Sequence, residues 1–388
     1  MMRLFFLFCL LSLRFLCSEP PEAYFVTWDN HPESTAIITW LAKGKPEQEL
    51  QFHKKGADAW QNVKVKGEPF SLLPDYLLFK APLEDLDPET LYEFSLPEGR
   101  KLYSFSTLPK ELNHPLKFIT GGDIYHDAIQ SVVEMNRVAA VQDPDFVLLG
   151  GDLAYAGSRF SFLSENGDRW LRFLKVWSYT MEKSDGSLIP LIAAIGNHEV
   201  NGSFDKTSDK AKGFYQLFLS SGPSYRAVDI GSYMTLWILD SGHTQPFEIQ
   251  AEWLESSLKE REAKPYKFAL YHVPAYPSVR AFDNKRSVKV RQFFVPLFEK
   301  YKLNAAFENH DHTYKRSHLI KEGKVDPEGV LYMGDGSWGA EPRKPRTEKE
   351  SWYIAQSAAS KHVLQVTLYK DKIQYHALGP NGVIIDSY

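Results

Sequence analysis

The sequence predicts two folded units in series: an antiparallel β-sandwich over residues 19–110 and an α/β unit with two packed sheets over residues 115–388. The first is indicated by short apolar segments that alternate with period two and are separated by turn residues. The second is indicated by a change at Leu116, after which apolar strands alternate with segments of helical periodicity. A chain of 388 residues is long enough for two such units.

A leader precedes both units. After MMR comes the run LFFLFCLLSL, which is too short to span a bilayer but matches the apolar region of a secretion signal. We expect residues 1–18 to be a signal peptide of a secreted, periplasmic or extracellular protein with no other integral membrane segment. The residues before any cleavage point are bulky, so an uncleaved anchor and a lipidated Cys17 remain alternatives. Because Cys9 and Cys17 are the two cysteines of the chain, the mature protein offers neither a disulfide nor a thiolate ligand.

The overall composition is that of a soluble globular protein, with 43% hydrophobic residues, 24% charged residues and a net charge of −4. This balance gives no indication of nucleic acid or an anionic membrane as a partner. An anionic substrate would need a local attraction, for example from bound cations. The composition leaves the oligomeric state open.

The first unit contains six strand-like segments: AYFVTW, TAIITWLA, ELQFHKK, YLLFKAPL, LYEFSL and KLYSFSTL. Their alternation and spacing predict an antiparallel sandwich. The segment LDPETLYEF places Tyr92 just after a turn, which resembles the tyrosine corner of fibronectin type III-like domains, with Trp40 as the core aromatic. Any other small β-sandwich is the alternative. STLPKELNHP is typical of a linker to the second unit.

The second unit begins with a βαβ-like series formed by LKFITGG, AIQSVVEMNRVAA, DFVLLGG, DRWLRFLKVWSYTME and LIPLIAAIG. Further strands and helices follow in YMTLWILDSG, QAEWLESSLKER, YKFALYHVP, VKVRQFFVPLFEKY and NAAFENHDH. HVLQVTLYKDKIQYHAL predicts an antiparallel hairpin around KD. We expect two packed sheets covered by helices, with a site where the strands end.

Most of these apolar strands end in residue types that bind metals. The residues are Asp123, Asp152, Asn197, His198, His272, His310 and His312, with Tyr155 three positions after Asp152. Strand ends of an α/β sheet gather on one edge, so residues distant in sequence can converge there. Oxygen donors suit hard cations, imidazole suits zinc and iron, and one carboxylate can bridge two cations about 3.5–4 Å apart. Such a pair acts on phosphate esters.

The order GD…GDLAY…GNHE…H…NHDH closely resembles the purple acid phosphatase family of the metallophosphoesterase, or calcineurin-like, superfamily, over most of the mature chain. The resemblance implies a fibronectin III-like domain followed by a two-sheet metallophosphoesterase domain. It also implies a secreted acid phosphatase that hydrolyses phosphate monoesters with a metal-bound hydroxide. The dinuclear centre of the family holds Fe(III) together with Zn, Mn or Fe(II).

The resemblance also implies roles for individual residues. The first metal would be held by Asp123, Asp152, Tyr155 and His312. The second would be held by Asp152 as a bridge, with Asn197, His272 and His310. His198 would be catalytic, because in the family this histidine binds the phosphate and assists the leaving group; a histidine that is not a metal ligand can donate a proton near neutral pH.

Three features depart from the family pattern. Tyr125 stands where the first motif has glycine, and Asn309 stands where the last motif has glycine. The extra histidines that many members carry after the fourth motif are missing, and Arg280 lies in that segment. We expect Tyr125, His126 and Arg280 to bind substrate without binding metal. His243, after LDSG, also ends a strand and could approach the site.

Two other functions remain compatible with the residues. The same dinuclear site could serve a phosphodiesterase or nucleotidase, because only the pocket would differ. A non-enzymatic secreted binding protein with a relic site is the other alternative. The expected partner is thus a phosphorylated small molecule or a nucleotide, and no nucleic acid is expected.

Overall fold

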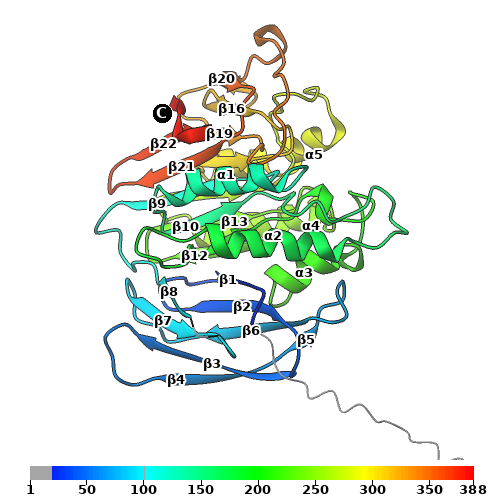
Figure 1. Cartoon of the computed structure of the whole chain (residues 1–388). Coiled ribbons are helices and arrows are strands. Elements are labelled where there is room, and N and C mark those ends of the chain that lie inside the picture. Colours follow the sequence, from blue (N-terminus) through cyan, green and yellow to red (C-terminus); the bar gives the residue numbers. More distant parts are fainter. Residues whose placement is uncertain (1–19, 100) are drawn as a thin grey trace, which may run out of the picture.

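The computed structural model describes residues 20–99 and 101–388, so the expected signal peptide at residues 1–18 lies outside the described residues, together with Cys9 and Cys17. The strands form sheets of ten, seven, four and two strands. Figure 1 shows them stacked in layers, with the first strands at the bottom and the C-terminus near the top.

The N-terminal unit consists of two antiparallel sheets. One has the strand order β4-β3-β7-β8, and β1, β2, β6 and β5 face it. The strands are β1 (Ala23–Thr27), β2 (Ala36–Ala42), β3 (Glu47–Lys54), β4 (Gln61–Lys66), β5 (Glu68–Pro69), β6 (Leu77–Leu83), β7 (Leu91–Ser95) and β8 (Leu102–Ser106). Exposed and buried residues alternate along most of β3, which is the pattern of a strand with one face exposed to solvent.

Aromatic side chains fill the space between these two sheets. Trp40 is fully buried and stacks on Phe79 with ring centroids 5.1 Å apart. The hydroxyl of Tyr92 accepts a hydrogen bond from the backbone N–H of Asp87 at 2.8 Å. A tyrosine hydroxyl that returns to the backbone a few residues upstream is the contact that defines a tyrosine corner.

The sandwich shares a sheet with the rest of the molecule. β1 pairs in parallel with β11 (Leu191–Ala193) through Thr27 and Leu191, and the hydroxyl of Thr27 donates to the carbonyl of Leu191 at 2.7 Å. The ten-stranded sheet therefore has the order β23-β22-β21-β9-β10-β11-β1-β2-β6-β5. Because hydrogen bonds join the two parts, the orientation of the sandwich relative to the strand ends is set by backbone geometry.

The α/β part of this sheet carries the first half of the expected βαβ series. Its other strands are β9 (Leu116–Gly121), β10 (Phe146–Leu149), β21 (Val363–Leu368), β22 (Ile373–Leu378) and β23 (Ile384–Ser387). β9, β10 and β11 are parallel, and β21 and β22 form the expected antiparallel hairpin. The outer face is covered by α1 (Ile129–Ala140) and α2 (Gly167–Thr180), as Figure 1 shows, and α3 (Lys212–Phe218) packs beside them.

The helices form where the apolar spacing predicts them. In α1 the buried residues Val132, Met135 and Ala139 recur every three or four positions, which places them on one face. α2 starts after Asn166, whose side chain accepts a hydrogen bond from the N–H of Arg169 at 3.2 Å. Such an N-cap satisfies a backbone donor that the helix itself leaves free.

The second sheet has seven strands in the order β12-β13-β14-β15-β19-β16-β20. They are β12 (Arg226–Ile230), β13 (Met234–Ile238), β14 (Tyr266–Leu270), β15 (Ala305–Glu308), β16 (Tyr314–Ser317), β19 (Leu331–Gly334) and β20 (Ile354–Ala358). Its outer face packs on α4 (Phe247–Glu260), α5 (Lys285–Phe293) and α6 (Val295–Lys300). The short elements are β17 (Ile320–Lys321), β18 (Lys324–Val325), η1 (Asn197–Glu199), η2 (Ser208–Lys210), η3 (Glu348–Glu350) and η4 (Pro380–Gly382).

The two large sheets meet in an aromatic core. Phe118 and Phe146 of the first sheet stack at 5.1 Å, and Phe268 and Phe307 of the second lie 5.5 Å apart. Phe118 meets both residues of the second sheet edge-on, at 5.8 and 5.9 Å. This packing fixes the sheets so that the loops after β9, β10, β14 and β15 come together. Among the described residues, no helix is both long and apolar enough to cross a membrane.

Candidate metal centre

The loops that follow β9, β10, β11, β14 and β15 meet at one edge of the stacked sheets. These strands are parallel to their neighbours, so their carboxyl ends lie together. The structure brings all seven of the predicted ligand positions into one group, Asp123, Asp152, Tyr155, Asn197, His272, His310 and His312, each within about hydrogen-bond distance of another member.

One half of the group contains Asp123, Tyr155 and His312. The Nε2 atom of His312 lies 3.0 Å from Oδ1 of Asp123, and the Tyr155 hydroxyl lies within 3.2 Å of both atoms. Burial, together with the carboxylates of Asp123 and Asp152, raises the pKa of Tyr155 well above its ordinary value. A phenolate at this position would therefore require a cation beside it.

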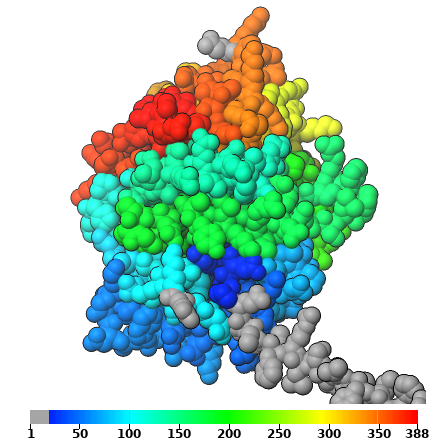
Figure 2. Space-filling view, in the orientation of Figure 1, coloured from blue at the N-terminus to red at the C-terminus, as the bar shows by residue number. Residues whose placement is uncertain are grey.

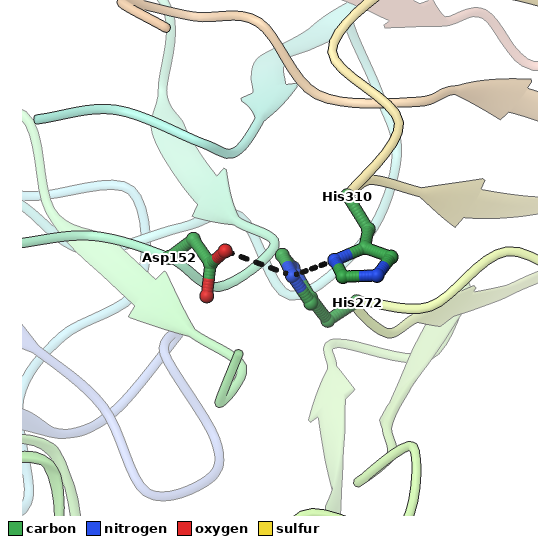
Figure 3. A group of neighbouring side chains, drawn as sticks. All are labelled: Asp152, His272 and His310. Atoms are coloured by element: carbon green, nitrogen blue, oxygen red, sulfur yellow. Dashed lines mark hydrogen bonds and ion pairs between the residues drawn. The ribbon is translucent and has the colours of Figure 1, made fainter. Parts of the chain in front are cut away.

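The other half contains Asp152, Asn197, His272 and His310. The Nε2 atom of His272 lies 3.2 Å from Oδ2 of Asp152, 3.1 Å from Oδ1 of Asn197 and 3.0 Å from Nδ1 of His310. Figure 3 shows the two imidazoles and the carboxylate directed toward one another from three different loops. One ligand atom from each of these three residues falls within 4.8 Å of the other two.

The donor atoms fit a cation. Nδ1 of His272 lies 2.9 Å from the carbonyl oxygen of Gly150, which turns Nε2 toward the oxygens of Asp152 and Asn197. Oδ2 of Asp152 is buried and receives no hydrogen bond from any described residue. Facing lone pairs repel unless positive charge lies among them, and oxygen with imidazole donors suits zinc or iron. Burial lowers the pKa of His272, but the carboxylates of Asp152 and Asp123 outweigh it and raise that pKa to about 9. Without a cation, a proton on Nε2 therefore supplies the positive charge that this position favours.

The backbone of the site is strained. Five of the seven positions are non-glycine residues with left-handed φ: Asp123 (56°), Asp152 (54°), Tyr155 (51°), His310 (81°) and His312 (58°). Such residues are uncommon, and they persist where the surroundings over-determine the backbone. The side chains therefore point together because tertiary packing holds each loop in a sharp turn.

Glycine is required where the loops cross. Gly151 has a φ of +91°. A Cβ atom on Gly196 would lie 2.3 Å from both the backbone nitrogen and Oδ1 of Asp152, which no side chain could tolerate. The glycines before Asp152 and Asn197 therefore allow the close approach that the sequence motifs predict.

Glu199 holds the loops after β10 and β11 together. Its carboxylate accepts hydrogen bonds from the backbone N–H groups of Asp152, Leu153 and Gly196 at 2.7, 2.8 and 2.9 Å. Burial, reinforced by the charge of Asp152, raises the pKa of Glu199 to about 8. Its partners are backbone donors, so Glu199 fixes the position of Asp152.

His198 lies at the open side of the group. Its ring stacks on Tyr155 with centroids 4.3 Å apart, and its side chain is 43% exposed. Its backbone N–H donates to Oδ1 of Asp152 at 2.7 Å, while its Nε2 is 4.0 Å from Oδ2 of the same residue. Burial lowers the pKa of His198, with the carboxylate of Asp152 acting against it. The ring is thus held beside the predicted ligands with a face toward solvent.

Comparison with known proteins identifies the family of the chain. The sequence model of the calcineurin-like phosphoesterase family matches residues 116–314, just over half of the chain. The chain belongs to this family. Relatives include purple acid phosphatase 21 (26% identical over 267 residues, 65% of this chain) and Fe(3+)-Zn(2+) purple acid phosphatase 12 (24% over 325 residues, 77% of this chain), both from Arabidopsis thaliana. The chain spans 56% and 66% of the lengths of these two proteins.

A solved structure shares the fold over nearly the whole chain. The purple acid phosphatase PPD1 from yellow lupin seeds (Lupinus luteus) superposes with a TM-score of 0.75 at 16% identity and covers 94% of this chain and 73% of that one. The architecture of this family member is therefore a metallophosphoesterase fold with several sheets and helices.

Tyr125 and His126, which depart from the family pattern, lie in different surroundings. The ring of Tyr125 is 4% exposed, with the guanidinium of Arg169 4.2 Å from its centroid. Arg169 of α2 thus lies over this ring, and a role of Tyr125 on the substrate side stays a prediction. The ring of His126 lies edge-on to those of Tyr155 and His312, at 4.8 and 5.7 Å, and its Nδ1 contacts the carboxylate of Asp127.

The other two departures are Asn309 in the last motif and the segment after the fourth motif that carries Arg280. Asn309 stands in place of a glycine but does not have positive φ, so this position does not need a residue that adopts left-handed backbone. The Nδ2 atom of Asn309 donates to the carbonyl of Tyr271 at 3.0 Å. Arg280 donates to the carbonyl of His310 at 2.8 Å and pairs with Asp311. Its guanidinium is thus already held by the last-motif loop.

His243 does approach the site, as its position after a strand suggests. It is fully buried, its Nδ1 lies 3.1 Å from the carbonyl oxygen of Ser203, and its ring is 5.7 Å from that of His272. Phe204 stacks on it at 4.8 Å and also meets the ring of His310 edge-on. His243 thus packs behind two of the predicted ligands.

Sequence reasoning missed a buried charge network beneath the last motif. Lys315 is fully buried, and its Nζ donates to Glu308 at 2.5 Å and lies 3.5 Å from Asp335. Glu308 also accepts from the Tyr271 hydroxyl and from the N–H of Ala275, both at 2.6 Å. The signal in the sequence was weak, because a lysine after the His312 motif is most simply interpreted as a surface residue.

Proposed function

We propose that this protein is a secreted metal-dependent phosphatase that hydrolyses phosphate monoesters at a dinuclear centre. In support, its relatives are named purple acid phosphatases, one of them an Fe(3+)-Zn(2+) enzyme. The observation that carries the proposal is the convergence of potential ligand atoms from Asp152, His272 and His310 in a buried site.

The residues suggest two ion positions that share one carboxylate. Asp123, Asp152, Tyr155 and His312 would hold Fe(III), and Asp152, Asn197, His272 and His310 would hold Zn, Mn or Fe(II), in keeping with the Fe(3+)-Zn(2+) relative. When bound, such a pair polarises phosphoryl oxygens, lowers the pKa of a coordinated water and supplies the positive charge that an anionic substrate requires.

The chain's own residues would orient the substrate and manage the proton of the leaving group. His198 is partly exposed and rigidly stacked on Tyr155, so its Nε2 can donate to an ester oxygen as that oxygen leaves. Glu199 keeps Asp152 in place through three backbone hydrogen bonds. His126 is placed to contact phosphate oxygens from the other side of Tyr155. Tyr125 and Arg280 would act by holding the loops that present the site.

We further propose that residues 19–110 form a fibronectin III-like domain in front of a catalytic domain at residues 115–388. Two features support this: the order β4-β3-β7-β8 opposite β1-β2-β6, and the hydrogen bond between Tyr92 and the backbone of Asp87. Residues 1–18 would be the signal that directs the protein out of the cell.

The test is metal analysis with a visible spectrum of the purified protein, followed by two assays. We expect iron and a second metal, a colour that is lost in Tyr155→Phe, and little turnover in Asp152→Asn. p-Nitrophenyl phosphate should be hydrolysed faster than bis-p-nitrophenyl phosphate. A colourless, metal-free and inactive protein would refute the proposal, whereas a strong preference for the diester would support the phosphodiesterase alternative.

A further inference from the structure

The loops after β9 and β10 run side by side beyond the ends of the two strands. Three backbone hydrogen bonds join them, from the N–H groups of Asp123, Ile124 and Tyr125 to the carbonyls of Gly151, Asp152 and Leu153, at 3.0, 2.9 and 3.0 Å. In the described part of the chain, the bond between Tyr125 and Leu153 is the last of this series. The series therefore holds Asp123 and Asp152 directly, whereas Tyr155 and His126 lie beyond its end.

The side chain of Arg169 connects the two loops where this series ends. Its Nε atom donates to the carbonyl of Ala154 at 2.7 Å, and its Nη2 atom donates to the carbonyl of His126 at 3.0 Å and also to that of Tyr125. Arg169 lies in the first turn of α2, a helix on the face of the molecule that Figure 2 shows. One side chain of this helix thus binds both loops.

Tyr125 provides the surface on which this guanidinium lies. The central carbon of the Arg169 guanidinium is 4.2 Å from the centroid of the Tyr125 ring, and the ring is buried. Such a contact is favourable because the face of the ring attracts a cation. The Tyr125 hydroxyl in turn accepts from Nη1 of Arg172, one turn further along α2, at 3.3 Å. The tyrosine that stands where the family pattern has glycine thus packs on Arg169, which a glycine could not do.

The carbonyls that Arg169 binds belong to the backbone that orients Tyr155 and His126. The carbonyl of Ala154 is part of the peptide bond to Tyr155, whose φ of 51° lies in the left-handed region. The rings of Tyr155 and His126 meet edge-on, with centroids 4.8 Å apart. Left-handed backbone at a non-glycine residue persists where the surroundings over-determine it. The guanidinium of Arg169 supplies such a constraint, because it is planar and its donors point in fixed directions.

We propose that Arg169 is a positioning residue, whose planar guanidinium holds the Tyr155 phenol and the His126 imidazole in place beside the predicted metal ligands. The inference rests on the proposed function, in which Tyr155 binds the first metal. Arg169 acts through backbone carbonyls and the Tyr125 ring, so it lies behind the ligands. Substitution of residues that support metal ligands in this way typically lowers metal affinity or activity by about 10–100-fold.

The test compares Arg169→Met with Arg172→Met, the same substitution one turn later on α2 at an exposed side chain. In iron-loaded Arg169→Met we expect the absorption maximum of the Tyr155 colour to shift. The affinity for Fe(III), measured in competition with a chelator, should fall about 10–100-fold. The affinity for zinc should stay within about twofold, because Arg169 has no contact with the ligands of the second metal in the described structure. Arg172→Met should keep the spectrum and both affinities of the parent.

Arg169→Lys separates the geometry of the side chain from its charge. Lysine keeps the positive charge but lacks the planar fork of donors, so we expect the spectrum and the iron affinity of Arg169→Met. A spectrum like that of the parent would show that the charge is enough and would overturn the inference. The same variant decides the question if Arg169→Met fails to fold.

Amide hydrogen exchange of the metal-free protein separates this inference from the proposed function. The amides of residues 123–128 and 153–157 should exchange faster in Arg169→Met than in the parent, and at the parent rate in Arg172→Met. A parent protein that binds no iron and still shows this pattern would contradict the proposed function alone. Unchanged exchange in Arg169→Met, or an unshifted spectrum with the parent's iron affinity, would overturn the positioning role of Arg169.

Discussion

Replacing Lys315 by methionine should destabilise the protein strongly, because it leaves a buried carboxylate without its cation. Lys315 and Glu308 are both fully buried and their charged atoms are 2.5 Å apart, with Asp335 at 3.5 Å. Burial acts to lower the pKa of Lys315, but Asp335 and Glu308 raise it above its ordinary value, so the lysine is charged in the folded state. Breaking such a pair from one side costs about 3–5 kcal/mol.

Thermal unfolding is the appropriate assay. For a chain of this size about 2 °C of melting temperature corresponds to 1 kcal/mol, so Lys315→Met should melt about 6–10 °C lower. The control is the double variant Lys315→Met/Glu308→Gln, in which the amide oxygen can still accept from Tyr271 and Ala275. It should recover at least about half of the loss, since the two residues are directly coupled. A single variant that melts within about 2 °C of the parent, or a double variant no better than the single, would refute the reasoning.

Three further predictions follow from local contacts. Burial raises the pKa of Glu165 from 4.5 to about 7, so the parent protein should lose stability as pH rises from 4.5 to 7, by about 3 kcal/mol at most. Melting temperatures measured across this pH range should show the trend in the parent protein and not in Glu165→Gln. Parallel pH profiles for the two proteins would contradict the prediction. Gly196→Ala puts a Cβ atom 2.3 Å from Oδ1 of Asp152, so the affinity of the protein for zinc should fall at least about tenfold. Calorimetry measures this affinity, and an unchanged value would refute the prediction. Tyr92→Phe removes the acceptor for Asp87 N–H and should cost about 1 kcal/mol in urea unfolding; no change would mean that water replaces the hydroxyl.

Much of the candidate site could be predicted from the sequence, because the motifs that mark its residues are short and local. Asp123, Asp152 and Asn197 each follow an apolar strand and a glycine, and parallel strands bring their carboxyl ends to one edge. The β21–β22 hairpin was predicted for the same reason, since its two strands flank a two-residue turn signal. Patterns of this kind can be recognised from residues that are close to one another in the sequence.

Other features could not be predicted, because they depend on segments far apart. The contact between the ring of Tyr125 and Arg169 of α2 had no signal in the sequence. Lys315 is buried because carboxylates from two other strand ends surround it. No local signal distinguishes such residues from solvated ones, since burial of a polar side chain is decided by its partners.

The sequence by itself determined many of the strands and helices, including six of the eight strands of the first unit, and the kinds of donor atoms at the strand ends, since periodicity and residue type act within a few positions. Only the tertiary structure decided that β1 joins β11 and makes one sheet of the sandwich and the α/β part. It also decided that the residues at the strand ends adopt left-handed backbone and face one another. Both features require contacts between segments more than a hundred residues apart. Such contacts stabilise the chain only after folding has brought the segments together, at the cost of conformational entropy.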